Sequence, residues 1–386
     1  MLATLCRLTG DLDAAEDALG EAVVVALEQW PQRGIPERPG AWLTTVSRRR
    51  AIDRLRRESR RTELEEQAML DEPDPLPWST VRDDQLRLIF TCCHPALSAD
   101  AQVALALRTL CGLTTPEIAA AFLVAEPTMG QRISRTKSKI RANKIAYRIP
   151  PDHELPQRLG AVLAVVNIVF TVGHHASAGA ALARVDLTDE GIRLGRLLVD
   201  LMPDEPECAG LLALMLSTAA RLPGRLDPDG DVALLADVDR SAWDGELTAE
   251  AVELLELTLR RARLGPYQLR AAISCLHSSA ADATDTDWPQ IVTLYRLLES
   301  VEPSIPVRVN RAVAEAEVSG PQVGLDLLDA VTGAERWHLF HAARADMLRR
   351  LDRPAEAADA YGRALDLQPN DSDRRFLQRR LAEVAP

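Results

Sequence analysis

Apolar residues recur every three or four positions along most of this chain, and no stretch between turn signals alternates strictly between apolar and polar residues. The first spacing is typical of amphipathic helices, whereas a half-buried strand has a period of two. We predict helices over residues 2–30, 41–61, 83–93 and 98–110, and further along the chain over 157–172, 189–201, 205–221, 248–262, 266–279, 288–300 and 307–318. The sequence therefore predicts an all-α protein.

Proline, glycine and acidic clusters separate these helices into groups. Residues 31–40 contain Pro31, Pro36 and Pro39 with two glycines, a composition that predicts a loop. A chain of 386 residues is also too long for a single compact core. We therefore predict a first domain over 1–61, an acidic proline-broken linker over 62–82, a second domain over 83–150 that ends before Pro151, and a helical third domain over 151–386.

Residues 113–148 have the pattern of a helix-turn-helix. Thr115 suits the N-cap of a short first helix, with Pro116 and Glu117 in its first turn. A second helix after Pro127 has a seam that we expect to be buried, formed by Met129, Ile133, Thr136 and Ile140. Its opposite side carries Thr128, Arg132, Arg135 and Lys139. A recognition helix in the major groove has this arrangement, as does an ordinary helical hairpin with a solvated basic face.

The net charge of −12 is unevenly distributed along the chain. Residues 1–150 carry 21 basic and 20 acidic side chains, whereas residues 151–386 carry 24 and 37. Segment 43–61 has eight arginines against two acidic residues, and segment 126–148 has seven lysines and arginines against one. Binding to nucleic-acid phosphates would be carried by these two basic segments.

The last two predicted helices, 337–351 and 354–367, fit the spacing of a tetratricopeptide repeat. The small residue of the first helix is Ala345, and the packing residues of the second are Ala357, Tyr361 and Ala364. His341 stands where the repeat usually has tryptophan. We therefore expect residues 151–386 to form an array of helical hairpins that resembles tetratricopeptide repeats.

The sequence contains no Gly-rich phosphate loop, nucleophile elbow or convincing catalytic set, so we expect neither an enzyme nor a bound cofactor. The six cysteines lack metal-ligand spacing and are typical of reduced cytoplasmic thiols, although Cys92-Cys93-His94 leaves metal or redox sensing open as a minor alternative. No uncharged apolar run reaches 18 residues, and the acidic N-terminus does not fit a signal peptide.

Two motifs carry a family resemblance. Residues 15–30 read AEDALGEAVVVALEQW, and residues 39–57 read PGAWLTTVSRRRAIDRLRR; both resemble region 2 of bacterial sigma factors. Residues 112–119, followed by Thr128, Arg132, Ile133 and Arg135, resemble sigma region 4. Their order, with an acidic linker between them, resembles the extracytoplasmic-function sigma factors. Segments 83–98, 265–274 and 309–321 resemble a subgroup whose large helical C-terminal extension is thought to help control activity.

Departures from this resemblance lie in both motifs. We expect the helix that precedes residue 15 in region 2 to be missing or much shortened. Gly20 stands where the family usually has glutamine, and Gly130 replaces a usual basic residue of the recognition helix. His174 and His175 lie in a stretch that is more aromatic in the family.

The resemblance implies a transcription initiation factor whose partners are core RNA polymerase and promoter DNA. The polymerase would be bound by Glu16, Asp17 and Glu21. The −35 element would be read by Thr128, Gln131, Arg132, Arg135, Lys137 and Lys139. The −10 element would be bound by Arg48, Arg49, Arg56 and Arg57, with the loop over 32–39 as the place of base capture.

Alternatives from other classes remain open at this point. The chain could be a helical-repeat interaction scaffold with a vestigial sigma half, or a sensor that binds a small molecule on its repeat domain. The acidic balance of residues 151–386 also predicts an intramolecular contact with the basic segments in the free protein.

Overall fold

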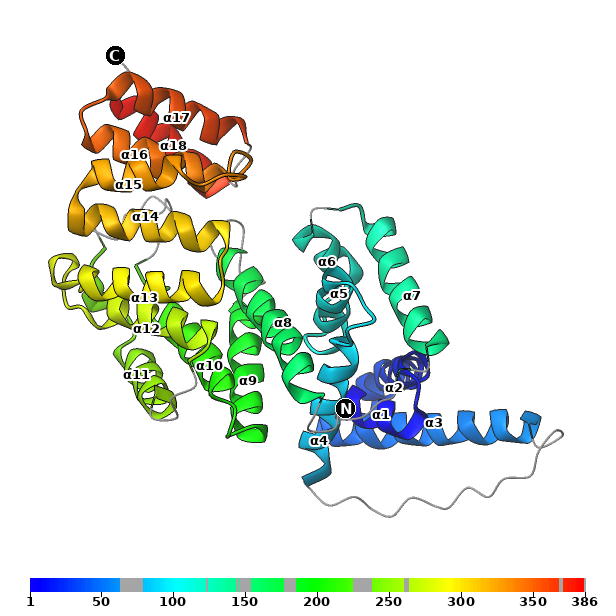
Figure 1. The fold of residues 1–386 in the computed structure, drawn as a ribbon. Helices are drawn as coiled ribbons and strands as arrows, with labels where there is room; N and C mark the ends of the chain where they lie inside the picture. Colours follow the sequence, from blue (N-terminus) through cyan, green and yellow to red (C-terminus); the bar gives the residue numbers. More distant parts are fainter. Residues whose placement is uncertain are drawn as a thin grey trace. The chain divides into compact units, whose positions relative to one another are not determined.

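The computed structural model describes residues 1–62, 79–122, 124–143, 145, 154–176, 185–224, 238–259, 264–367 and 371–384. Over these residues every regular element is a helix, which confirms the all-α prediction (Figure 1). The chain divides into two compact units, Met1–Ile168 and Val169–Pro386. Most of the predicted acidic linker, residues 63–78, lies outside the described part.

The first unit begins with three helices, α1 (Leu2–Thr9), α2 (Leu12–Arg33) and α3 (Pro39–Thr62). The side chain of Asp11 caps α2 by accepting a hydrogen bond from the Ala14 amide at 3.0 Å. Helix α2 packs on both α1 and α3. Its buried residues are alanines spaced three or four apart: Ala15, Ala18, Ala22 and Ala26.

The predicted loop over 31–40 is much shorter in the structure. Helix α2 continues through Pro31 to Arg33, and α3 starts at Pro39, so only residues 34–38 are non-helical. Pro31 lies inside α2 close to its end, where it removes one i→i−4 hydrogen bond, and Pro39 occupies a first turn, where its missing donor is not needed. Gly34, with φ of 80°, ends α2.

Four more helices complete the part of this unit that precedes residue 150: α4 (Ser79–Cys92), α5 (Ala99–Thr109), α6 (Thr115–Ala121) and α7 (Glu126–Ala142). Helix α1 packs on α4, and Arg7 Nε lies 3.0 Å from a carboxylate oxygen of Asp84, whose side chain is 1% exposed. The apolar core includes Leu88, Ile89, Phe90, Leu105, Leu107, Ile118 and Met129.

Thr114, and not the predicted Thr115, precedes the first helix of the helix-turn-helix. The Glu117 carboxylate accepts hydrogen bonds from the Thr114 amide at 2.7 Å and from its hydroxyl at 2.6 Å. The prediction was displaced by one residue because two consecutive threonines offer equivalent caps, and Glu117, three residues after Thr114, accepts both hydrogen bonds from the first of them.

We expect Glu117→Ala to lower the free energy of unfolding by about 0.5–2 kcal/mol, the range for losing a helix cap. The contact is exposed, so the lower half of this range is favoured. Urea denaturation followed by circular dichroism measures it. Glu126→Ala, which removes an exposed glutamate from the first turn of α7, is the matched control; an equal loss in both variants would contradict a specific role for the cap.

The second unit is a succession of helix pairs. It continues from α8 (Leu155–Ala176), within which the unit boundary falls, through α9 (Val185–Leu201), α10 (Pro206–Ala219), α11 (Gly245–Leu259), α12 (Pro266–Ser279), α13 (Trp288–Val301), α14 (Ile305–Ser319), α15 (Pro321–Asp329), α16 (His338–Arg350), α17 (Pro354–Asp366) and α18 (Asp371–Val384). From α9 on, each helix packs on the next described one, as in a solenoid.

The tetratricopeptide-like pair is confirmed as α16 and α17. The predicted packing residues Ala345, Ala357, Tyr361 and Ala364 are all buried in one apolar cluster. No described helix of either unit is long and apolar enough to cross a membrane.

The start of α12 depends on a glycine. The Glu207 carboxylate of α10 accepts hydrogen bonds from the amides of Tyr267 and Gln268, both at 3.1 Å. A Cβ atom at Gly265 would lie only 2.3 Å from the Glu207 carboxyl carbon, so a side chain there would displace this carboxylate. Gly265 therefore allows α10 to cap α12.

We expect Gly265→Ala to lower the free energy of unfolding by about 1–3 kcal/mol, because the added methyl group would displace the Glu207 side chain and two helix amides would lose their acceptor. Denaturant titration of the full chain provides the measurement. Gly362→Ala is the control, since a Cβ there would have no neighbour within 4 Å and α17 should gain slightly. A neutral Gly265→Ala variant would refute the steric argument.

Candidate nucleic-acid interface

Helix α7 has one buried side and one exposed basic side, as the sequence predicts. Met129, Ile133 and Thr136 are buried against the rest of the unit. The predicted −35 residues Thr128, Gln131, Arg132, Arg135 and Lys139 are all exposed. Because the apolar seam fixes the rotation of the helix, these side chains are presented together to solvent.

Lys137 differs from the other predicted −35 residues. Its side chain is only 14% exposed, and its Nζ lies 2.7 Å from Glu16 and 3.1 Å from Asp13. Burial alone would lower the pKa of Lys137, but its hydrogen bond with Glu16 and the nearby carboxylate charges raise it. Lys137 is therefore charged and paired with α2 in this structure.

The arginines of α3 fall into two sets. Arg50 and Arg54 point to α2, where they lie 3.8 Å from Glu21 and 2.7 Å from Asp17. Of the predicted −10 residues, Arg49 and Arg56 are exposed and Arg48 is half-buried, whereas the side chain of Arg57 lies outside the described part. The exposed arginines give α3, the helix that follows residues 34–38, a cationic surface.

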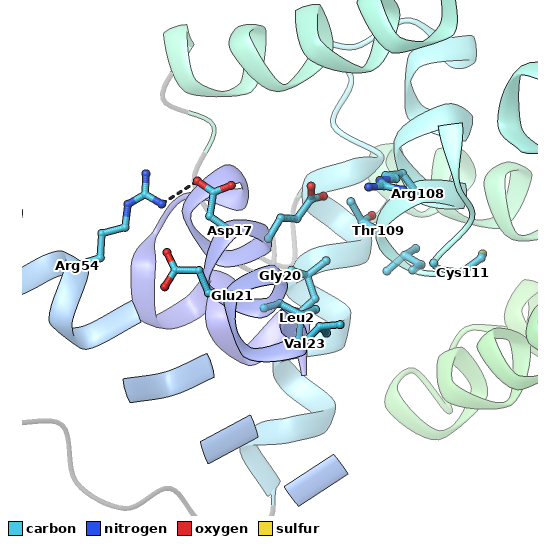
Figure 2. Close-up of a pocket in the computed structure, with 13 residues that line it drawn as sticks. Leu2, Asp17, Gly20, Glu21, Val23, Arg54, Arg108, Thr109 and Cys111 are labelled. Atoms are coloured by element: carbon cyan, nitrogen blue, oxygen red, sulfur yellow. Dashed lines mark hydrogen bonds and ion pairs between the residues drawn. The ribbon is translucent and has the colours of Figure 1, made fainter. Parts of the chain in front are cut away.

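The predicted polymerase-binding residues Glu16, Asp17 and Glu21 lie on one face of α2. They line a hollow of about 840 Å³ whose other wall is formed by residues 108–112, the end of α5 and the residues that follow it. Figure 2 shows Asp17 and Glu21 on one side of this hollow and Arg108, Thr109 and Cys111 on the other. Each of the three carboxylates also has a cationic partner within the same unit.

Two features of this region were missed by the sequence reasoning. Val23, Val24 and Leu27 form an exposed apolar strip on α2, with Leu27 70% exposed. Large apolar side chains gathered on a surface are typical of protein interfaces. The sequence signal for this strip was the run VVVAL at residues 23–27, which has more consecutive apolar residues than one buried helix face requires. The second feature is the pairing of Arg141 with Asp11 and Asp13, which no local pattern indicates.

The cysteines beside His94 have the character of core residues. Cys92 and Cys93 are fully buried, and Cys92 Sγ lies 3.1 Å from Thr109 Oγ1. Burial raises the pKa of Cys92 to about 12 and that of Cys93 well above its usual value, so both stay as unreactive thiols. Across the described residues, no group of histidine, cysteine and carboxylate side chains is arranged to hold a metal ion.

We expect both thiols to resist modification by a thiol reagent in the native full chain, because a thiolate is the reacting form and burial disfavours it. Mass spectrometry after brief labelling tests this, with half-buried Cys111 as the internal control that should react first. Rapid native-state labelling of Cys92 or Cys93 would instead support the sensing alternative.

Comparisons with known proteins find three family matches along the chain and two similar proteins. Residues 1–61 match the family model Sigma-70 region 2, residues 87–140 match Sigma-70, region 4, and residues 158–259 match a family of unknown function, DUF6596. An uncharacterized protein of Rhizobium meliloti is 40% identical over all of this chain and 93% of its own length. The ECF RNA polymerase sigma factor SigJ of Mycobacterium tuberculosis is 27% identical over 50% of this chain and 68% of its own.

Proposed function

Because this chain belongs to the extracytoplasmic-function sigma factors that carry a large helical C-terminal extension, we propose that it directs core RNA polymerase to promoters whose −35 element is read by α7 and whose −10 element is bound beside α3. As a sigma factor it is an initiation factor that acts by binding polymerase and DNA, and not by catalysis. We expect it to act in the cytoplasm, where its polymerase is.

The observation that carries this proposal is the two-sided character of α7. Its exposed side offers Arg132 and Arg135 for guanine edges or phosphates, with Thr128, Gln131 and Lys139 as further contacts. Lys137 would join them only after leaving its carboxylate partners on α2.

The −10 element would be bound as single-stranded DNA. We propose that residues 34–38 receive a flipped base and that Arg48, Arg49, Arg56 and Arg57 follow the phosphate backbone of the displaced strand. The loop joins α2 to α3 directly, so a base held there lies beside the first turns of the arginine-bearing helix.

Polymerase would be bound by α2. Glu16, Asp17 and Glu21 suit a basic groove on the polymerase. The adjacent apolar strip of Val23, Val24 and Leu27 adds apolar surface that would be buried on binding. Charged residues would then select the partner and its orientation, while the apolar strip would supply most of the affinity.

The C-terminal helical domain is proposed to modulate this activity. Its excess of acidic residues favours an electrostatic contact with the basic segments of the free protein. Small-angle scattering of the full chain at rising salt tests this contact, since screening should increase the separation between the two units. An unchanged separation would exclude it.

Run-off transcription tests the function itself. Purified bacterial core polymerase would be supplied with the full chain and a promoter library, with core polymerase alone as the control. We expect specific start sites only when the protein is present. If none is found although the protein is folded, the interaction-scaffold alternative is favoured.

A further inference from the structure

A second hollow, of about 370 Å³, lies within the C-terminal unit among α11, α12 and α13. Helices α11 and α13 both pack on α12 (Figure 1). Each of the three helices lines the hollow with one of its faces; on α13 these residues are Gln290, Leu294 and Leu297, at the spacing of a single helix face. Protein interiors contain few voids larger than a water molecule, so a hollow of this size is a candidate binding site.

The walls of the hollow are mainly apolar. Leu255, Leu269 and Cys275 line it and are almost fully buried. Leu264 and Leu297 also line it, yet they are 48% and 40% exposed. Apolar surface therefore continues from the inside of the hollow to solvent, and covering it with an apolar group is favourable.

The hollow offers no buried partner for an ion. Among its described lining residues the one carboxylate is that of Glu256, which is exposed, as are the polar residues Ser279 and Gln290. Burial raises the pKa of the Cys275 thiol to about 11, so this side chain is uncharged. An ion that entered would lose its hydration without gaining an opposite charge, and an anion would also be repelled by Glu256. These residues favour a neutral occupant.

Gln268 supplies a hydrogen-bond donor that is not used. This residue lines the hollow and is 1% exposed. Its Oε1 accepts a hydrogen bond from the Gly265 amide at 3.0 Å, which fixes the orientation of the side-chain amide. Its Nε2 is shielded from solvent and has no hydrogen-bond partner in the described part of the chain. A buried donor without a partner is unfavourable, and a ligand oxygen would satisfy it.

We propose that this hollow binds a small, neutral, mainly apolar molecule that places a carbonyl or hydroxyl oxygen against Gln268 Nε2. The volume is at the lower end of the ~300–1,000 Å³ of small-molecule sites. An apolar cavity of ~150 Å³ holds benzene, so this hollow holds roughly two groups of that size. Because Nε2 is shielded in the empty hollow, binding requires a shift of side chains, a common change when a partner binds.

A helix of a partner protein fits these observations less well. A helix is about 10 Å wide with its side chains, so it could insert only side chains into the hollow. The apolar side chains that suit the walls carry no acceptor, and the Gln268 donor would stay unpaired. A small molecule with one oxygen satisfies both the walls and the donor.

The bound molecule would contact a residue that already joins two helices. The backbone amide of Gln268 donates to the Glu207 carboxylate of α10. Occupation of the hollow would therefore stabilise the start of α12 and its junction with α10. The inference concerns the C-terminal unit alone and goes beyond the proposed function, so a failure of run-off transcription would leave it unaffected.

The dye prodan is a suitable probe, because it is neutral, has a naphthalene ring and one ketone oxygen, and changes its emission in apolar surroundings. We expect saturable binding to the full chain with emission at shorter wavelength. The melting temperature of the full chain should rise with the concentration of the dye. The anionic dye anilinonaphthalene sulfonate should not displace prodan; displacement would contradict the neutral character of the site.

Ala272→Phe tests the location of the dye. Ala272 is half-buried on α12 and lines the hollow, so a phenyl ring there would occupy the space. We expect saturable prodan binding to be lost. Ala355→Phe is the matched control, because it places the same ring at an exposed position of α17. Equal prodan affinity for Ala272→Phe and the unmodified chain would overturn the proposal.

Gln268→Met tests the hydrogen bond and keeps a side chain of similar length. We expect prodan affinity to fall about three- to tenfold, the usual effect of losing one hydrogen bond. The affinity for phenylnaphthylamine, a neutral dye without an oxygen, should be unchanged. A folding defect would weaken the binding of both dyes equally, and such a result would refute the role of the donor.

Sedimentation of the full chain tests the remaining occupant, a second copy of the protein that covers Leu264 and Leu297. We expect these leucines to be free in solution, so Leu297→Glu should leave the sedimentation coefficient unchanged. A dimer that dissociates in the Leu297→Glu variant would mean that a second copy fills the hollow, and the small-molecule site would then be excluded.

Discussion

Replacing Arg132 and Arg135 together by alanine should lower promoter-specific run-off transcription on the order of 100-fold, the largest effect that we expect from any surface change. Both side chains are exposed on the side of α7 that is opposite its buried seam. An arginine that makes a bidentate contact with guanine discriminates by ~1–3 kcal/mol, and each 1.4 kcal/mol is tenfold. Neither side chain supports the core, so the fold should be unaffected.

The single variants separate base reading from phosphate binding. Removal of an arginine that reads a base should relax the sequence preference at one promoter position. Removal of an arginine that binds a phosphate should leave the sequence preference unchanged and reduce the salt dependence of binding. Arg363→Ala is the matched control, because it removes an exposed arginine from α17 in the other unit. If the double variant initiates as well as this control, α7 does not read the −35 element.

The secondary structure was largely predictable because most helices have a regular apolar seam. The seam on α7 is confirmed for Met129, Ile133 and Thr136, which are buried, whereas Ile140 at its end is half-buried. Helix α12 has the predicted bounds, Pro266–Ser279. Helix α15 was missed because Gly324 and Pro321 have the composition of a turn. In the structure a Cβ at Gly324 would lie 2.6 Å from that of Ala316, so the glycine permits a close crossing of α14 and α15.

Helix α18 was missed for a different reason. It is rich in charge, and only Leu377 and Val384 among its described residues are buried apolar side chains. The last helix of an array has a neighbour on one side only, so its periodicity is weak. A pattern search that requires a wide apolar face overlooks such a terminal helix.

The candidate site was predictable only as far as local spacing determines it. The rotation of α7 follows from its seam, so the exposure of Arg132 and Arg135 could be anticipated. The pairing of Lys137 with Glu16 joins residues 121 positions apart, and nothing in either helix specifies it. The roles in DNA and polymerase binding assigned to these residues stay predictions until they are tested.

A chain that ends after residue 150 should be strongly destabilised, whereas one that ends after residue 168 should fold. The first compact unit extends to Ile168 and so includes the first half of α8. Arg158 is 9% exposed, and its Nη2 donates a hydrogen bond to the Phe90 carbonyl at 2.7 Å. The apolar side chains buried in this half are Leu159, Val162, Leu163, Val165 and Val166.

Burial of each such side chain contributes about 1.5–3 kcal/mol, and a whole domain is stable by only ~5–15 kcal/mol. The 1–150 fragment lacks these side chains and the Arg158 hydrogen bond to Phe90, so we expect it to be much less stable than 1–168. Thermal melting followed by circular dichroism compares the two fragments. We expect a cooperative transition for 1–168 and a weak or absent one for 1–150.

This comparison decides which fragment can be used to test whether the C-terminal domain inhibits or activates transcription initiation. If 1–168 folds and initiates more strongly than the full chain, the C-terminal domain inhibits; weaker initiation means that it assists. If only the 1–150 fragment fails to initiate transcription, the cause is the loss of packing in its core and not the loss of regulation by the C-terminal domain. Equal melting temperatures for the two fragments would instead mean that the first half of α8 adds little to this unit, and the sequence-derived boundary at Pro151 would then be the better one.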